Sequence, residues 1–127
     1  MYQTVIVPHF RRQLERYVKK YRHLARAVIH ILDSFDARQH ARLGGNVYKV
    51  RIKTKDLPRG KSSGFRLIVL VVEVHKYLVP ATLYFKGDKD TLSQKEINDH
   101  LSAVYFELEM QKLLSSKTTN KPLSSNG

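Results

Sequence analysis

Residues 48–72 of the 127-residue chain read YKVRIKTKDLPRGKSSGFRLIVLVV, and this stretch decides the fold. In its first part, apolar residues alternate with cations: Tyr48, Val50 and Ile52 alternate with Lys49, Arg51 and Lys53. A period of two is typical of a strand, and it places the cations on the face opposite the apolar residues. Its last part, residues 65–72, is apolar except for Arg66, which predicts a central strand covered on both faces.

The same stretch concentrates positive charge. From Lys49 to Arg66 there are seven cations and one acid, Asp56, in a chain whose net charge is +12. The cations are Lys49, Arg51, Lys53, Lys55, Arg59, Lys61 and Arg66. Clustered cations in a chain of pI near 10.1 are typical of a protein that binds a polyanion, and nucleic acid is the first candidate. An anionic membrane surface fits less well, because no strongly apolar face opposes the charge.

Composition excludes several other classes. The chain has no cysteine, so disulfides and thiolate metal sites are impossible, and its six histidines lack zinc-ligand spacing. We therefore expect neither a metal nor a cofactor. No run of about 18 apolar residues predicts a membrane helix, and residues 1–10 do not resemble a secretion signal. We expect a soluble cytoplasmic protein.

The flanking segments complete one predicted domain, residues 1–114. Residues 4–7 predict a short strand that ends at Pro8. Residues 9–35 have helical apolar spacing, and compactness favours two helices with a break near residues 21–23. Their other faces carry many cations, which are either solvated or in contact with RNA or a partner protein. Residues 36–46 are expected to be a loop.

A third hairpin strand is predicted at residues 78–86, with Pro80 near its beginning. Ser93 and Glu96 have the spacing of a capping box, which predicts a helix running to about Leu114. Residues 115–127 are polar and predict a disordered tail. The order is β-α-α-β-β-β-α, so we expect an α+β fold whose small, antiparallel-rich sheet has helices packed on one face.

Four segments in this order resemble the RelE/HigB family of toxins from bacterial type II toxin–antitoxin modules. The segments are Tyr48-Lys49-Val50-Arg51-Ile52, Gly60-Lys61-Ser62-Ser63-Gly64-Phe65-Arg66, Leu83-Tyr84-Phe85-Lys86, and residues 88–93 with Glu96. The second segment is similar to the family motif Gly-Lys-Ser-Gly-Gly-Tyr/Phe-Arg. The order of helices and strands also matches the family fold, over roughly residues 1–114.

The resemblance implies a ribosome-dependent mRNA endonuclease, or mRNA interferase, that inhibits translation and forms a hetero-oligomer with its antitoxin. By position, the catalytic candidates are Lys49, Arg51, Arg66 and Lys86. Candidates for RNA binding are Lys53, Lys55, Arg59, Lys61 and Tyr84. Two alternatives stay open: a ParE-like inhibitor of DNA gyrase with the same fold, and a nucleic-acid-binding domain without catalysis.

The proposed chemistry agrees with the residue types. When a 2′-hydroxyl attacks the adjacent phosphate, cations stabilise the charge of the phosphorane, and the fork of Arg66 suits phosphate oxygens. Neighbouring cations disfavour the charged form of a lysine, and this makes Lys49 or Lys53 a candidate general base. Other readings remain: Arg66 could cap the sheet or pair with Asp88 or Asp90, and the lysine face could simply be solvated. Tyr84 could pack in the core instead of stacking on a base.

Overall fold

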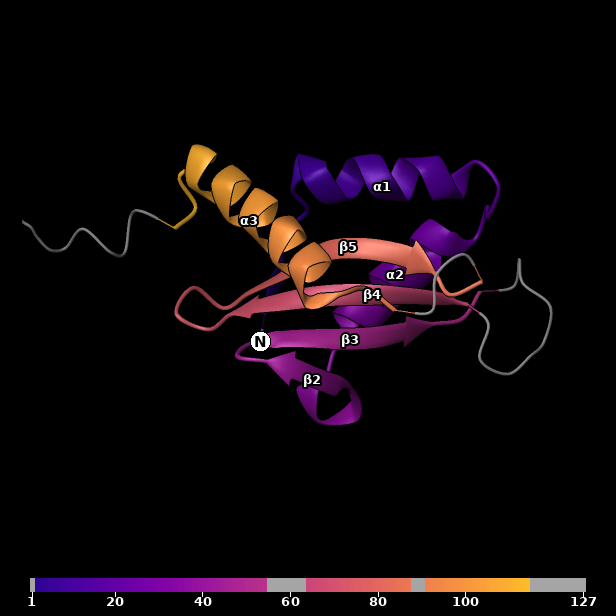
Figure 1. Cartoon of the computed structure of the whole chain (residues 1–127), viewed down its shortest axis with the longest axis horizontal. Helices are drawn as coiled ribbons and strands as arrows, with labels where there is room; N and C mark the ends of the chain where they lie inside the picture. Colours follow the sequence, from indigo (N-terminus) through magenta and orange to yellow (C-terminus); the bar gives the residue numbers. More distant parts are fainter. Residues whose placement is uncertain (1, 55–63, 88–90, 115–127) are drawn as a thin grey trace, which may run out of the picture.

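The computed structural model of the chain describes residues 2–54, 64–87 and 91–114, which form a five-stranded sheet with three α-helices (Figure 1). In chain order the elements are β1 (Gln3–Thr4), α1 (Pro8–Val18), α2 (Leu24–Asp33), a short 3-10 helix (Ala37–Gln39), β2 (Ala41–Gly44), β3 (Val47–Ile52), β4 (Phe65–Val72), β5 (Tyr77–Phe85) and α3 (Gln94–Met110). The strand order is β1-β5-β4-β3-β2, and every pair except β1–β5 is antiparallel. The predicted α+β class and antiparallel-rich sheet are confirmed.

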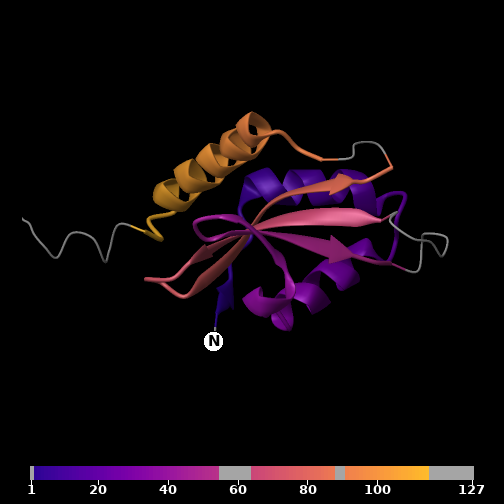
Figure 2. The same ribbon diagram turned by 60° about the horizontal axis from the view of Figure 1, so that its bottom comes forward.

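The helices lie on both faces of the sheet, which corrects the expectation that they pack on one (Figures 1 and 2). Leu67 and Val69 of β4 pack with Val28 and Leu32 of α2, in the same cluster as Phe10 of α1. Ile68 and Leu70 of β4 pack on the opposite face, in a second cluster that includes Val104 and Leu108 of α3. Because β4 is apolar on both faces, each face needs a helix to remove it from water.

Strand β2 replaces part of the loop that was expected over residues 36–46. It pairs with β3 through a two-residue turn at Gly45 and Asn46, and Gly45 has a φ of +51°. Asp36 begins the preceding 3-10 helix by accepting a hydrogen bond from the Arg38 N–H. The loop prediction was wrong because Gly44-Gly45-Asn46 is a hairpin turn, which pairs the short segment before it with the strand after it.

The predicted break in the long helical segment is confirmed. Helix α1 ends at Val18 and α2 begins at Leu24, without a glycine or proline between them. The Tyr21 ring lies in this break, with its centroid 5.0 Å from that of Phe65 and 5.9 Å from that of Phe85. Packing of Tyr21 against these strand residues favours a turn of the chain here over a continuous helix.

Helix α1 also covers an edge of the sheet. Strand β1 pairs with β5 only at Tyr77 and Leu78, so it is shorter than the predicted strand of residues 4–7. Beyond it, the Gln13 side chain on α1 accepts hydrogen bonds from Thr82 Oγ1 and the Leu83 N–H of β5. A side chain thus satisfies a backbone donor that no strand reaches.

Helix α3 begins with the predicted capping box. Ser93 Oγ accepts from the Glu96 N–H at 3.1 Å, and Glu96 Oε1 accepts from the Ser93 N–H at 2.8 Å. The helix ends at Met110, four residues before the predicted end. The extent of the single domain stays a prediction, and the predicted disordered tail, residues 115–127, lies outside the described residues.

Candidate functional site

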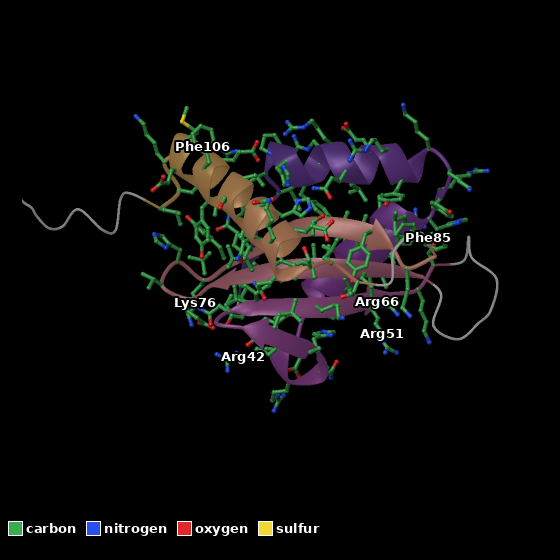
Figure 3. The ribbon with its side chains drawn as sticks, viewed as in Figure 1. Arg42, Arg51, Arg66, Lys76, Phe85 and Phe106 are labelled. Carbon is green, nitrogen blue, oxygen red and sulfur yellow. The ribbon has the colours of Figure 1, made fainter. Side chains whose placement is uncertain are left out.

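Three polar side chains form a row across three neighbouring strands. Arg51 of β3 is the register partner of Arg66 on β4, and Arg66 is the partner of Tyr84 on β5. Directly opposed residues in antiparallel strands project from the same face of the sheet. Arg51 and Arg66 lie at the same end of the sheet, away from Arg42 and Lys76 (Figure 3). We call Arg51, Arg66 and Tyr84 the arginine row.

The face that carries the arginine row is the α3 face, since Tyr84 packs in the cluster of Val104 and Leu108. Helix α3 covers the part of this face nearer the turn between β4 and β5 (Figures 1 and 3). The arginine row lies beyond the first turn of α3. On this face, α3 therefore leaves uncovered the end of the sheet where Arg51 projects, and Arg51 is exposed.

The lysine candidates flank the arginine row. Lys49, the register partner of Ile68, precedes Arg51 by two residues and therefore shares its face. The Lys86 N–H donates to the Gly64 carbonyl at 2.9 Å, which extends the β4–β5 ladder one step past Phe85 and puts Lys86 at the same end of the sheet. Lys53 is exposed just beyond the end of β3. The loop candidates Lys55, Arg59 and Lys61 lie outside the described residues.

Arg66 is a buried cation, with 5% of its surface exposed. Burial lowers the pKa of Arg66, the charge of Arg51 lowers it further, and Tyr84 opposes the change. An arginine nevertheless keeps its proton in proteins. Asp88 and Asp90, the alternative partners considered for Arg66, lie outside the described residues. Arg66 Nη1 donates a hydrogen bond to the Phe65 carbonyl at 3.3 Å. Two neighbouring positive charges, one of them poorly solvated, favour an anion close to both.

Tyr84 is also buried, with 7% of its surface exposed. Burial raises the pKa of its hydroxyl, while the adjacent Thr91 side chain and the charge of Arg66 oppose the rise. The hydroxyl lies beside Thr91 but forms no well-aligned hydrogen bond with any described residue. A buried hydroxyl without a partner is unusual, because desolvation without a hydrogen bond costs about 1–3 kcal/mol. Tyr84 thus combines the predicted core packing with an available polar group.

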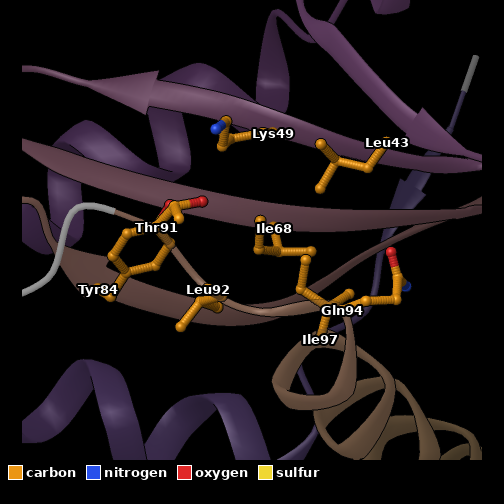
Figure 4. A pocket seen from close by; sticks show the side chains of 8 residues that line it. All are labelled: Leu43, Lys49, Ile68, Tyr84, Thr91, Leu92, Gln94 and Ile97. Carbon is orange, nitrogen blue, oxygen red and sulfur yellow. The ribbon is translucent and has the colours of Figure 1, made fainter.

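A cavity of about 170 Å³ adjoins the arginine row. Figure 4 shows its lining, with Lys49 on one strand, Tyr84 on another, and the first turn of α3 opposite. The lining residues are Leu43, Lys49, Ile68, Tyr84, Thr91, Leu92, Gln94 and Ile97. Lys49 and Tyr84 therefore border both the cavity and the arginine row, which joins the two features into one candidate site.

The sequence prediction did not include three residues that line this cavity: Leu43, Thr91 and Gln94. Leu43 was missed because β2 was expected to be a loop, although the Gly44-Gly45-Asn46 turn indicated a hairpin. Thr91 lies two residues before the capping residue Ser93, which located the start of α3, and Gln94 directly follows it. Nothing in the sequence showed which strand that helix end would face.

Four ion pairs between described residues lie away from the arginine row. They join Arg12 to Glu107, Arg38 to Asp36, Lys76 to Glu73 and Lys95 to Asp99. The cations of α1 and the following turn are exposed, including the ion-paired Arg12: Arg11, Arg12, Arg16, Lys19, Lys20 and Arg22. The described residues contain no cluster of three metal-ligating side chains, and none of their helices has the length and apolarity needed to cross a membrane.

Comparisons with known proteins identify relatives of this chain. The model of the family described as "RelE toxin of RelE / RelB toxin-antitoxin system" matches residues 9–124. No curated protein matches the chain. Among solved structures, it is similar to an E. coli toxin RelE mutant with two arginines replaced, in the free state, at 17% identity and a TM-score of 0.43. That match covers 70% of this chain and 87% of the other.

Proposed function

The chain belongs to the RelE family of toxins of toxin–antitoxin systems, and on this premise we propose that it is an endoribonuclease that cuts mRNA on the ribosome. The observation that carries the proposal is the arginine row: Arg51 and Arg66 are direct register partners on a face that the helices leave partly uncovered. Paired guanidinium groups bind phosphate oxygens in a geometry that lysine cannot reproduce. Membership of the family alone would leave the chemistry open.

In the proposed reaction, the 2′-hydroxyl of one nucleotide attacks the phosphorus that joins it to the next. A bond forms between the 2′-oxygen and phosphorus, the bond between phosphorus and the 5′-oxygen breaks, and the departing 5′-oxygen takes a proton from water. The products are a 2′,3′-cyclic phosphate and a 5′-hydroxyl. Arg51 and Arg66 stabilise the additional negative charge on the phosphorane.

Lys49 is the candidate that receives the proton of the 2′-hydroxyl. Of the two lysines considered for this role, Lys49 borders the arginine row and the cavity, whereas Lys53 lies beyond the end of β3. Lys86, at the same end of the sheet, adds positive charge near the leaving oxygen. In this proposal the exposed lysines bind RNA phosphates, which a basic chain of +12 favours.

The family is one of toxin–antitoxin systems, so an antitoxin is the expected protein partner. We propose that the chain forms a hetero-oligomer with this antitoxin in the cytoplasm, and that the ribosome and mRNA are its targets. An antitoxin rich in acidic residues would oppose the +12 charge of the toxin and shield the arginine row.

A purified translation system with one defined mRNA tests the proposal. Sequencing of RNA ends after addition of the full chain should show cuts inside codons, with 5′-hydroxyl ends, only when ribosomes are present. The Arg51→Ala/Arg66→Ala variant should leave the mRNA intact, while Arg26→Ala, an exposed change on α2, should cut like the unmodified protein.

Two competing functions give different results. A ParE-like protein would inhibit supercoiling by DNA gyrase and leave mRNA intact. A non-catalytic binder would shift RNA in a gel without producing new ends. Intact mRNA on translating ribosomes, with the chain folded as judged by circular dichroism, would overturn the nuclease proposal.

A further inference from the structure

We propose that the cavity beside the arginine row binds one pyrimidine base, that of the nucleotide whose 2′-hydroxyl attacks the scissile phosphate. This inference rests on the proposed function and adds to it a base preference at the cleavage position. Five features support it: the size of the cavity, its apolar walls, its polar groups, the Tyr84 hydroxyl and the position of the cavity relative to Arg66.

The size of the cavity fits a single ring. Its volume is about 170 Å³. An apolar protein cavity of about 150 Å³ binds benzene, so a space of this size holds one six-membered ring with its substituents. A purine has a second, fused ring. The volume therefore favours cytosine and uracil over adenine and guanine.

The walls suit the two faces of a flat base. Four apolar side chains line the cavity: Leu43, Ile68, Leu92 and Ile97. They come from β2, β4, the segment before α3 and α3 itself, so they surround the space from different directions (Figure 4). Single-stranded RNA bases are commonly recognised by packing of their faces against side chains and hydrogen bonding at their edges.

The polar lining supplies the hydrogen bonds. Lys49, Thr91 and Gln94 reach the same cavity. Gln94 is held at the start of α3, where its Nε2 donates to Asn98 Oδ1 at 3.1 Å. A few fixed polar groups among apolar walls are typical of a small-molecule site.

The Tyr84 hydroxyl is the most specific feature. The side chain lines the cavity and is 7% exposed, and its buried hydroxyl lies beside the Thr91 side chain without a well-aligned hydrogen bond to any described residue. A protonated phenol donates a hydrogen bond, and the O2 carbonyl is an acceptor that cytosine and uracil share. A pyrimidine in the cavity would thus give this hydroxyl a better-aligned acceptor than the adjacent Thr91 side chain does.

The position of the cavity matches the order of groups in a nucleotide. Arg66 and Ile68 project from the same face of β4, about 7 Å apart along the strand. Lys49, the register partner of Ile68, lines the cavity and precedes Arg51 by two residues on the same face of β3. A phosphate at the arginine row and a base over Ile68 would place the connecting ribose, with its 2′-hydroxyl, beside Lys49.

The test uses four mRNAs that differ only in the base 5′ to the cleaved bond, on translating ribosomes. We expect the full chain to cut after C or U at least about tenfold more efficiently, in kcat/KM, than after A or G. Leu92→Ala widens the cavity and should reduce this ratio toward one by admitting purines. Met110→Ala, an exposed change at the far end of α3, should keep the ratio. Equal cleavage after all four bases, or a preference for purines, would overturn the inference.

A measurement without ribosomes separates this inference from the proposed function. Cytidine and adenosine monophosphates are added to the full chain with labelled isoleucine methyl groups. CMP should shift the NMR signals of Ile68 and Ile97 more than AMP does, while exposed Ile29 serves as the internal control. These shifts without mRNA cleavage would refute the nuclease and support the base pocket. Cleavage without base preference or CMP shifts would refute the pocket alone.

Discussion

His9 Nε2 and His100 Nδ1 lie 2.8 Å apart and join the first helix to the last across 91 positions of the chain. Because each atom belongs to an imidazole ring, one nitrogen must donate and the other must accept, so at least one ring is neutral. The contact is reinforced by the His9 N–H, which donates to Glu107 Oε1 at 2.7 Å. This contact holds α3, and with it one wall of the cavity, against α1.

The stability of the protein should fall in mild acid. Burial lowers the pKa of His9 from 6.5, an effect that Glu107 opposes and Arg12 and Arg16 reinforce. Burial, and to a smaller extent the charge of His9, lowers the pKa of His100, while the carboxylates of Asp99 and Glu96 oppose this change. A lowered pKa means that the unfolded chain binds more protons. The stabilisation is therefore complete above about pH 6.5 and is lost as the pH falls through the lower folded values.

Urea denaturation at pH 7.5 and pH 5.5 tests this prediction. The midpoint of the unmodified chain should fall at the lower pH, and His100→Gln should reduce that fall. His30→Gln, which replaces an exposed histidine on α2, should behave like the unmodified chain. The same pH dependence in all three proteins would contradict a role for the His9–His100 contact.

Arg66→Lys should nearly abolish cleavage although it keeps the positive charge. Lysine cannot bind two phosphate oxygens through a planar fork, so we expect the rate to fall about 10²- to 10³-fold. Single-turnover cleavage of ribosome-bound mRNA measures the change. The thermal unfolding of the variant should be measured as well, because a substitution of the buried Arg66 can also change stability. A folded Arg66→Lys variant with full activity would remove the guanidinium from the mechanism.

Tyr84→Phe should reduce cleavage while leaving the stability of the protein nearly unchanged. The hydroxyl forms no well-aligned hydrogen bond with the adjacent Thr91 or with any other described residue, so its removal should change the free energy of unfolding by less than about 0.5 kcal/mol or increase it. If the hydroxyl binds a pyrimidine, cleavage after C or U should fall about tenfold, the value of one hydrogen bond. A substantial loss of stability would show instead that the hydroxyl serves the fold.

Gln13→Leu should destabilise the sheet edge. Gln13 Oε1 accepts from Thr82 Oγ1 and the Leu83 N–H, and the substitution leaves both buried donors unsatisfied. We expect a loss of about 1–3 kcal/mol in the free energy of unfolding, measured in urea. The exposed change Gln39→Leu should stay within about 0.5 kcal/mol of the unmodified chain. Equal midpoints for the two variants would contradict the edge-covering role of Gln13.

Ser93→Ala should loosen the beginning of α3. It removes the acceptor of the Glu96 N–H, and loss of such a cap costs about 1 kcal/mol. Hydrogen exchange should increase most in the first turn of α3, next to the cavity, while Ser102→Ala on the exposed side should have little effect. Exchange that increases evenly along the whole helix would argue against a local capping effect.

Local patterns in the sequence determined much of the fold. Alternation in residues 48–53 gave the strand and its cationic face, the apolar run of residues 65–72 gave the central strand, and Ser93 with Glu96 gave the start of α3. These features depend on side-chain periodicity and capping, which act over a few residues and can be read without the tertiary structure. The break near Tyr21 followed only from compactness, and its cause is packing against Phe65 and Phe85.

Only the tertiary structure decided which residues meet. The register of β3, β4 and β5 aligns Arg51, Arg66 and Tyr84, although Arg66 and Tyr84 are 18 positions apart in the chain. The placement of α3 on the second face of the sheet formed a cavity whose lining includes Leu43 and Gln94. The His9–His100 contact joins α1, near the start of the chain, to α3. Strand register and helix placement minimise the exposed apolar surface of the whole chain, so no short segment contains the information that sets them.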